Sequence, residues 1–417
     1  MSKTIRLRLC VMMFLEFFIW GGWFVTLGSY LAANLHASGA QTALAYSSQS
    51  WGAIIAPFIV GLIADRYINA ERLLGALHLA GGLLLYALYS ARDFSAFYPY
   101  VLTYMILYMP TLALVNAIAF RQMDEPARHF SGLRVWGTIG WIVAGLVISY
   151  LFSWDSRSGI DAGLLRNTFL MCSLASCALG LYSFTLPRTP PQPRLGQPRR
   201  LGDLLGLEAL RLMRQRNFGI FFVASILICI PLAFYYQNTN QFLTEIHVAN
   251  ATGKQTFGQM SEVLFMLLIP VFLRTFGMKT TLLVGMLAWA CRYLLFAFGN
   301  AQQLAFMLIV GIALHGVCYD FFFVSGQIYT DSKAGAAYKA AAQGLITLAT
   351  YGLGMLIGFS AAGFIDDLYS AGGGHDWRAI WLYPAAFAAA VFVLFALTFR
   401  NEKVAYDVTA APSSGRA

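Results

Sequence analysis

Charged side chains inside long apolar stretches are the residues of this sequence that could do chemistry. Five of them interrupt otherwise hydrophobic runs: Glu16, Arg134, Glu262, Arg292 and Asp320. Such charges are costly inside a bilayer, so they usually mark a substrate or proton pathway. A carboxylate whose contact with an Arg changes between two states of a protein can load and release a proton. We therefore predict that Asp320 or Glu262 couples proton entry to movement of a solute, with Arg134 as a candidate partner.

One face of a predicted helix combines Arg134, Thr138 and Trp141, which fall at i, i+4 and i+7. A guanidinium, a hydroxyl and an indole together suit a polar ligand that contains a ring. The alternative for Arg134 is a side chain that reaches along the membrane interface towards the cytoplasm.

Two further segments bring polar groups beside the candidate acids. Gln259 and Glu262 stand at i, i+3 in an apolar run, so they are neighbours on one helix. His315 and Tyr319 lie one turn apart on another helix, with Asp320 next to Tyr319. The structural alternative for both acids is a buried ion pair between helices that has no role in transport.

Glu16 and Arg292 have structural alternatives of their own. Glu16 shares a helical face with Trp20 and Trp23, where it either lines a cavity with the two indoles or pairs with a neighbouring helix. For Arg292 we favour a structural or snorkelling role over contact with a solute.

The elements that must position these side chains are membrane-spanning helices. The chain has 417 residues, of which 59% are hydrophobic and 11% are charged, whereas soluble domains are about 25% charged. Because a span needs about 20 apolar residues, we predict helices near 8–34, 42–64, 72–91, 96–120, 132–153, 163–187, 218–246, 256–276, 280–299, 302–329, 338–365 and 377–399. The predicted fold class is an all-α polytopic membrane protein with twelve transmembrane helices.

The positive charges indicate the orientation of the chain. An even number of spans puts both termini on one side, and 22 of the 28 Lys and Arg residues fall in the segments on that side. Cytoplasmic loops carry the excess of Lys and Arg, so both termini are predicted to be cytoplasmic. The net charge of +9 therefore reflects topology. Because the basic residues are spread over separate loops, we predict no nucleic-acid partner.

A basic, proline-rich segment divides the chain into two halves of similar length. We predict an N-terminal six-helix bundle over 1–187, a cytoplasmic basic linker over 188–217, a C-terminal six-helix bundle over 218–400 and a disordered cytoplasmic tail over 401–417. Two such halves indicate a duplicated transporter fold that binds its solute near the midplane between them. The six cysteines lie within or at the edges of apolar helices without metal-ligand spacing, so we expect no metal site and no cofactor.

The end of the second predicted helix carries Gly61, Asp65 and Arg66 in a pattern that resembles the loop motif of the major facilitator superfamily. The resemblance implies that this acid and this base brace the cytoplasmic ends of neighbouring helices in one transport state. The motif is incomplete, because Asn69 and Ala70 stand where a glycine and a basic residue are usual. The alternative is a solvated loop that follows the positive-inside pattern.

Longer segments resemble the nucleoside:proton symporter family of that superfamily, which includes nucleoside permeases of Gram-negative bacteria. The most specific segments are Phe17 to Trp23, Tyr108 to Leu112, Arg134 to Gly140, Gln259 to Glu262 and Tyr319 to Phe321. The resemblance implies the major facilitator fold, with two six-helix halves.

The same resemblance assigns roles to individual residues. It implies that Arg134, Thr138, Gln259 and Glu262 contact the nucleoside, and that Asp320 is an acid implicated in transport. Trp141, His315 and Tyr319 occupy places where nucleoside permeases have other aromatic residues, so we include them among the candidate substrate-binding residues.

The seventh predicted helix departs from the family pattern. Ala233 and Tyr236 stand where nucleoside permeases have a Gln and an Asn, whereas Gln237 and Asn238 lie one step further along, about 100° around the helix. We include Tyr236 and Gln237 among the candidate substrate-binding residues.

These observations predict a monomeric secondary transporter that imports nucleosides by proton symport across the inner (plasma) membrane. It would work by alternating access between two helical bundles. The first alternative is a proton-coupled transporter of the same fold for another polar solute, such as a sugar or glycoside. A second alternative is a membrane enzyme or sensor. We do not expect an enzyme, because the sequence has no HExxH and no GxSxG, and Gly311 to Gly316 lacks the Lys of a phosphate loop.

Overall fold

The computed structural model describes residues 2–60, 63, 67–123, 126–191, 207–371 and 374–402. The first half of the chain forms α1 (Lys3–Phe24), α2 (Leu27–Leu35), α3 (Gly39–Ile59), α4 (Ala70–Ser90), α5 (Phe94–Arg121), α6 (Pro126–Leu146), η2 (Val147–Leu151), α7 (Arg157–Asp161), η3 (Leu164–Arg166) and α8 (Asn167–Ser183). The chain continues with η4 (Leu207–Arg214), α10 (Arg216–Glu245), α11 (Ala251–Phe298), α12 (Ala305–Tyr319), η5 (Asp320–Val324), α13 (Ser325–Thr347), η6 (Leu348–Gly354), α14 (Met355–Leu368), β1 (Ser370–Ala371), β2 (Gly374–His375) and α15 (Trp377–Thr398).

The described helices account for the predicted membrane spans. Ten helical stretches, several of them made of consecutive elements such as α1 and α2, are long and apolar enough to cross a membrane. One of these, α11, has 48 residues and is divided at Gly277, where φ is 76° and ψ is 174°. This backbone conformation is not helical, and glycine adopts it readily. It breaks the helix at Gly277, so α11 forms two consecutive spans. α3 adds a further helix of 21 residues, so twelve membrane-length helices lie where the sequence predicts them.

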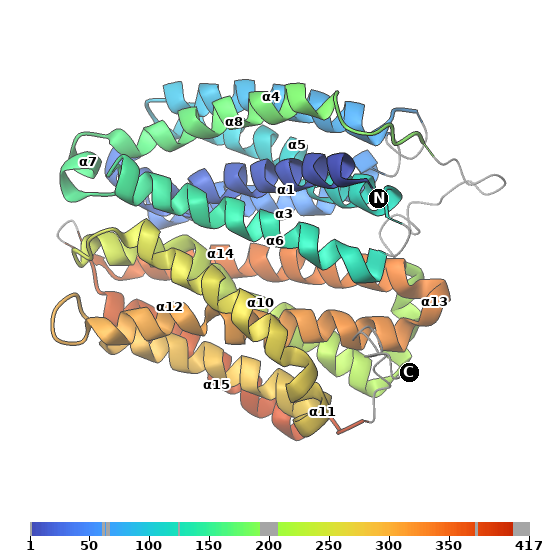
Figure 1. The fold of residues 1–417 in the computed structure, drawn as a ribbon. Helices are drawn as coiled ribbons and strands as arrows, with labels where there is room; N and C mark the ends of the chain where they lie inside the picture. The colour runs from blue at the N-terminus through green and yellow to red at the C-terminus, as the bar shows by residue number, and fades with distance from the viewer. Residues whose placement is uncertain are drawn as a thin grey trace, which may run out of the picture.

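Figure 1 shows these helices as two bodies, one above the other. In the upper body α1 packs against α6 and α8, and α4 packs against α5 and α8. In the lower body α11 packs against α12 and α15, and α10 packs against α14. The predicted boundaries of the halves stay a prediction, because residues 192–206 of the predicted linker and the tail from 403 onwards lie outside the described residues.

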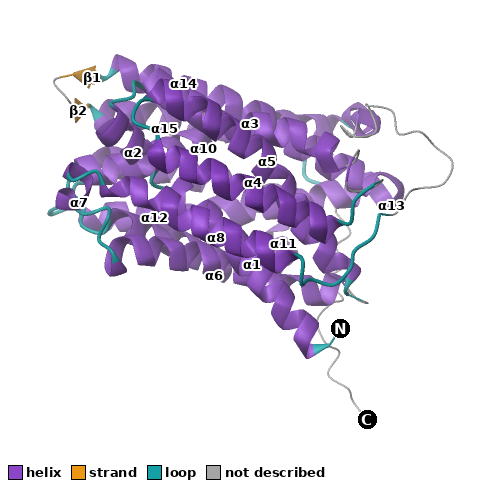
Figure 2. Cartoon of the chain, turned by 90° about the horizontal axis from the view of Figure 1, so that it is seen from above, coloured by secondary structure: helices purple, strands orange, loops and turns teal. Residues whose placement is uncertain are grey.

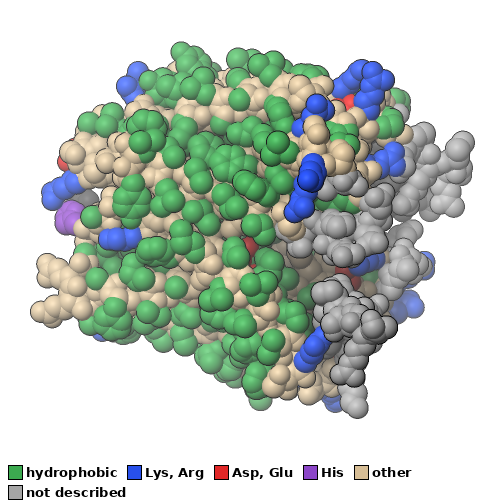
Figure 3. All heavy atoms as spheres, in the orientation of Figure 1, with side chains coloured by type: hydrophobic (Ala, Val, Ile, Leu, Met, Phe, Trp, Pro, Cys, Tyr) green, Lys and Arg blue, Asp and Glu red, His purple; other side chains and the backbone are tan. Residues whose placement is uncertain are grey.

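The surface of the molecule suits a bilayer. Figure 3 shows hydrophobic side chains over the middle of one face, and Lys and Arg side chains towards its two ends. Several fully apolar side chains are exposed, including Leu83, Leu267 and Leu397 at 71%, 73% and 80%. Exposure of large aliphatic side chains on this scale marks a surface that faces lipid.

Side-chain caps begin several helices at the end of the molecule that lies away from the start of α1. Ser38 and Gln41 form a reciprocal capping box at α3. Asp93 caps α5 and Asp376 caps α15, each accepting from a backbone N–H of its own helix at 2.9 and 3.1 Å. Figure 2 shows the short β1–β2 hairpin at this same end. We call this end of the molecule, away from the start of α1, the capped end.

Candidate functional site

A small cavity lies where the two halves meet. It measures about 20 Å³, which is room for about one water molecule. Its lining residues are Gly21, Val25, Trp141, Gly145, Tyr235, Tyr236, Thr252, Gln255, Thr256 and Gln259. Among the predicted site residues, Trp141, Tyr236 and Gln259 therefore meet at this cavity, and the halves are closely apposed around it.

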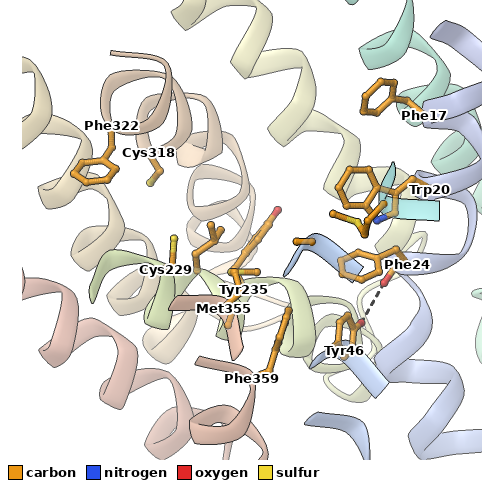
Figure 4. Packing of buried hydrophobic residues seen from close by; sticks show 14 of the residues in the cluster. Phe17, Trp20, Phe24, Tyr46, Cys229, Tyr235, Cys318, Phe322, Met355 and Phe359 are labelled. Atoms are coloured by element: carbon orange, nitrogen blue, oxygen red, sulfur yellow. Dashed lines mark hydrogen bonds between the residues drawn. The ribbon is translucent and has the colours of Figure 1, made fainter. Parts of the chain in front are cut away.

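Aromatic rings approach the cavity from both halves. Trp20 makes an edge contact with Trp141, with ring centroids 5.6 Å apart, and Phe24 reaches Tyr236 across the interface at 5.9 Å. In Figure 4, Trp20 and Phe24 lie on one side of Tyr235 and the lower-body core lies on the other. Rings on both walls suit a planar ligand, because flat rings stack favourably.

Arg134 and Glu262 lie on α6 and α11, two helices of opposite halves that pack against each other. The Arg134 guanidinium lies 4.0 Å above the centre of the Phe17 ring. The Glu262 side chain is 20% exposed. Thr138, one turn after Arg134, is half-buried. The interface therefore offers a cation, a carboxylate and a hydroxyl to a polar ligand.

Helix α12 adds two further predicted residues, His315 and Tyr319. The His315 Nε2 atom is 4.0 Å from the Glu262 Oε2 atom, and the Tyr319 hydroxyl is 3.0 Å from the Tyr351 hydroxyl of η6. His315 is buried, whereas Tyr319 is half-buried. The structure therefore groups four predicted residues, Arg134, Glu262, His315 and Tyr319, around the interface.

Asp320 follows Tyr319 directly and begins the π-helical segment η5. Its carboxylate is fully buried, and neither oxygen has a hydrogen-bond partner within the described part of the chain. A buried polar atom without a partner costs free energy, and π-helical segments often occur at functional sites. Asp320 therefore has the surroundings of a group that changes its partner or its protonation during function.

Gln237 and Glu16 lie away from the cavity. Gln237 is fully buried and donates to Asp366 at 2.9 Å, and Asn238 donates to the other oxygen of Asp366 at 2.7 Å. Glu16 is also fully buried, and it accepts from His78 at 2.8 Å and from Thr111 at 2.6 Å. Glu16 is thus a structural partner of two neighbouring helices, and the interpretation that it lines a cavity is wrong.

The remaining predictions concern Arg292, the loop motif and a metal site. Arg292 is fully buried, so its snorkelling interpretation is wrong. Gly61, Asp65 and Arg66 lie outside the described residues. Within the described residues, no three His, Cys, Asp or Glu side chains are placed to hold a metal ion.

Sequence reasoning missed the remaining polar lining of the cavity. Thr252, Gln255, Thr256 and Gln259 all line it from α11. Gln259 was predicted, and the other three stand three, four and seven residues before it, so helical spacing from Gln259 would have found them. Tyr351 has no comparable signal, because its place depends on how η6 packs against α12.

Carboxylates also join the two halves at the capped end. Asp367 of α14 accepts from the backbone N–H groups of Gly39 and Ala40 at 2.6 and 2.8 Å. Asp155, which follows η2, accepts from the backbone N–H of Thr252 at 2.9 Å. Each acid therefore caps the first turn of a helix in the opposite half, where helix-end charge favours an anion.

Two further hydrogen bonds between the halves lie at the same end. Ser149 accepts from the backbone N–H of Gly253 at 2.7 Å, and Ser29 donates to Asn240 at 2.6 Å. Within the described residues, all hydrogen bonds between the halves are at the capped end. The molecule is thus closed at this end.

A titratable pair ties the hairpin to α10 at the capped end. His375 Nδ1 lies 3.0 and 3.1 Å from the two carboxylate oxygens of Glu245. Burial by itself lowers the pKa of His375, but the hydrogen bond and charge of Glu245, with the charges of Asp366 and Asp367, raise that pKa above its ordinary value.

Comparisons with known proteins give the chain its relatives. The family model described as "Nucleoside H+ symporter" matches residues 1–404. YegT of Escherichia coli (strain K12) is 40% identical over 402 residues, which cover 94% of this chain and 93% of that protein. Xanthosine permease of the same organism is 34% identical over 414 residues, with 95% and 96% covered. The crystal structure of the nucleoside transporter NupG has a TM-score of 0.84 and 29% identity, and the match covers 95% of this chain and 100% of that one.

Proposed function

The chain belongs to the nucleoside H+ symporter family, and from this premise we propose that the interface between its two halves is where it binds nucleoside and proton. The predicted family, the all-helical major facilitator fold and nucleoside symport are confirmed. The protein is a multi-pass membrane transporter and not an enzyme.

The proposed substrate site is centred on the cavity and on the pair of charges beside it. Its members are Arg134, Thr138, Trp141, Tyr236, Gln237, Gln259, Glu262, His315 and Tyr319. The observation that carries the proposal is that Trp141, Tyr236 and Gln259 line one cavity between the halves. The rings would stack on the base, while the amide and hydroxyl groups hydrogen-bond to base and ribose. Gln237 joins this set only if α10 rotates and frees it from Asp366.

The proposed proton carrier is Glu262, with Asp320 as a second acid. Glu262 is a partly exposed carboxylate of α11, the helix that packs against α6 and its Arg134 at the interface, so a nucleoside that binds there changes its surroundings directly. One proton from the outer side of the membrane would bind to the Glu262 carboxylate while the substrate is bound. The same proton would leave once the site opens to the cytoplasm. Asp320 is fully buried, whereas Glu262 is partly exposed.

The proposed location is the inner (plasma) membrane, with both termini cytoplasmic and the chain acting as a monomer. In that orientation the capped end faces outwards, so its hydrogen bonds close the outer side. Alternating access would break these contacts and close the cytoplasmic side instead. Gly61, Asp65 and Arg66 would brace the cytoplasmic helix ends in one of the two states.

The proposed substrates are nucleosides, and the relatives favour them over a sugar or glycoside. One relative is named a xanthosine permease, and the solved relative is named a nucleoside transporter. The first candidate substrates are therefore purine and pyrimidine nucleosides, tested beside free sugars.

Uptake into proteoliposomes containing the full chain tests this function. A membrane potential of 100 mV supplies about 2.3 kcal/mol per proton, which permits roughly 50-fold accumulation for one proton per nucleoside. We expect accumulation that a protonophore abolishes and that excess nucleoside, but not excess sugar, inhibits. Glu262→Gln should keep nucleoside exchange and lose accumulation. Glu402→Gln, which changes an acid paired with Lys333, serves as the matched control.

Two results would contradict the proposal. Inhibition by sugars alone would move the protein to the alternative substrate class. Full accumulation by Glu262→Gln would remove Glu262 from the proton pathway.

A further inference from the structure

Arg292 is a buried cation whose surroundings the transport function does not yet explain. Its side chain is fully buried in α11, and its guanidinium lies 3.3 Å from the centre of the Tyr235 ring. The Nε and Nη2 atoms make no hydrogen bond within the described part of the chain. Burying a cation without a carboxylate partner is expensive. A charge kept there at such a cost points to a role beyond packing.

A hydrogen bond from Arg292 fixes the state of a histidine. Its Nη1 atom lies 3.3 Å from the Nδ1 atom of His315. A guanidinium has only donors, so Nδ1 must accept. His315 is then neutral in this arrangement and carries its proton on Nε2. Tyr235 stacks against the same imidazole with centroids 5.3 Å apart and planes 20° apart, which holds the ring in place.

The Nε2 atom fixed in this way faces the acid at the interface. It lies 4.0 Å from the Oε2 atom of Glu262, with the histidine side chain 3% exposed and the glutamate side chain 20% exposed. This separation is longer than a hydrogen bond, and a small rotation of the Glu262 side chain would close it. Arg292, His315 and Glu262 therefore form a line from the interior of the lower body to the interface between the halves.

We propose that Arg292 is a positioning residue for proton coupling, because it holds His315 as the neutral tautomer that presents its Nε2 proton to Glu262. The proposal rests on Glu262 being the proton acceptor of the proposed function. Arg292 touches neither the substrate nor the transferred proton. It acts by aiming one donor at the carboxylate and by placing a fixed positive charge behind it.

Several other ionisable groups surround this line. They are Arg134 of α6, Tyr235 and Tyr236 of α10, Cys291 and Tyr293 of α11, Cys318 and Tyr319 of α12, Asp320 of η5 and Tyr351 of η6. Arg134 stands on the opposite wall, so it responds to movement of the halves. Arg292 and His315 belong to the same half as Glu262, so their contact can persist through the transport cycle.

The test is the pH dependence of initial nucleoside uptake by the reconstituted full chain at a fixed membrane potential. Arg292→Gln removes the charge. His315→Phe keeps a ring for Tyr235 and removes both nitrogens. Arg292→Lys keeps the charge. Arg274→Gln removes an exposed Arg from the same helix and is the matched control.

We expect Arg292→Gln and His315→Phe each to move the pH of half-maximal uptake upwards by about one unit, because loss of a nearby positive charge or donor makes protonation easier. The double variant should show less than the sum of the two single shifts, since both residues act in part through one contact. Arg292→Lys and Arg274→Gln should stay near the wild-type value.

A lower rate at every pH with an unmoved midpoint in Arg292→Gln would show a merely structural role and overturn the proposal. Additive shifts in the double variant would overturn it too, because Arg292 would then act independently of His315. If Arg292→Gln does not fold, His315→Phe tests the proposal by itself. An unmoved midpoint in His315→Phe would show that the Nε2 proton of His315 does not act on Glu262, and would overturn the proposal.

Glu262→Gln separates this inference from the proposed function. If that variant still accumulates nucleoside, the proton role of Glu262 fails, and the role of Arg292 fails with it. If accumulation is lost there while Arg292→Gln keeps the wild-type midpoint, only the inference about Arg292 fails.

Discussion

Replacing Asp367 by asparagine should loosen the capped end, because this carboxylate holds the start of α3 from the opposite half. Asp367 accepts two backbone hydrogen bonds, from Gly39 and Ala40, at 2.6 and 2.8 Å. Asparagine offers one oxygen and no charge, so one charge-assisted bond and the attraction to the helix end are lost. Hydrogen bonds to charged groups contribute about 1.5–3 kcal/mol.

The exposure of Asp367 puts its loss at the lower limit, about 1.5 kcal/mol. This corresponds to roughly a tenfold rise in the population that is open at this end. Asp155 is buried and accepts from Thr252 at 2.9 Å and from Ser149. We therefore expect a larger effect for Asp155→Asn, about 2–3 kcal/mol or roughly 30- to 150-fold.

Thiol labelling measures this opening directly. Val25 lines the cavity just behind the capped end, so Val25→Cys reports access once the six native cysteines are replaced by alanine. A membrane-impermeant thiol reagent is added on the side that the capped end faces. The labelling rate should rise about tenfold with Asp367→Asn and further with Asp155→Asn.

Asp93→Asn and Asp376→Asn are matched controls for the labelling. Both acids cap helices at the same end, but each cap lies within one half, so losing it should leave the interface closed. Equal labelling of all four variants would refute the reasoning, because the rise would then come from weaker helices and not from a separated interface. An unchanged rate with Asp155→Asn would refute it as well.

Two further predictions concern stability in detergent. Protonated His375 is stabilised by Glu245, and its pKa is raised. This stability, about 0.5–1 kcal/mol, is therefore complete below the ordinary histidine value of about 6.5 and is lost as pH rises through the raised pKa. His375→Gln should flatten that fall in melting temperature, and identical pH profiles for both proteins would contradict the assignment. Glu16→Ala leaves His78 and Thr111 without their buried acceptor, so it should lower the free energy of unfolding by about 3 kcal/mol with little change in KM. An unchanged melting temperature with a large rise in KM would instead make Glu16 a substrate ligand.

Much of the fold could be predicted because a bilayer imposes simple rules on sequence. Every span must be about 20 apolar residues long, and backbone groups in lipid must bond within a helix. The predicted span near 8–34 is nevertheless interrupted after Phe24 in the structure. Val25 and Thr26 stand at that break, between Gly22 and Gly28. Because glycines also occur inside unbroken membrane helices, the sequence alone does not locate the break.

For the candidate site, the sequence predicted which residues share a face of one helix, but not which helices bring their faces together. Spacing grouped Arg134 with Thr138 and Trp141, since residues on one helix keep fixed relative angles. The contact between Trp141 and Trp20, at 5.6 Å, joins two helices whose rotation the sequence does not state. The same freedom left Glu16 between two interpretations until its bonds to His78 and Thr111 were seen.

The sequence by itself determined that this is a helical membrane protein with charges in its spans, and its family motifs pointed to nucleoside symport. The tertiary structure alone decided which of those charges face the interface and which are enclosed. Gln237 illustrates the reason, since one residue step turns a side chain about 100° around a helix and aims it at Asp366 and away from the cavity. Hydropathy depends on which residues a span contains, whereas a binding site depends on how that span is rotated against its neighbours.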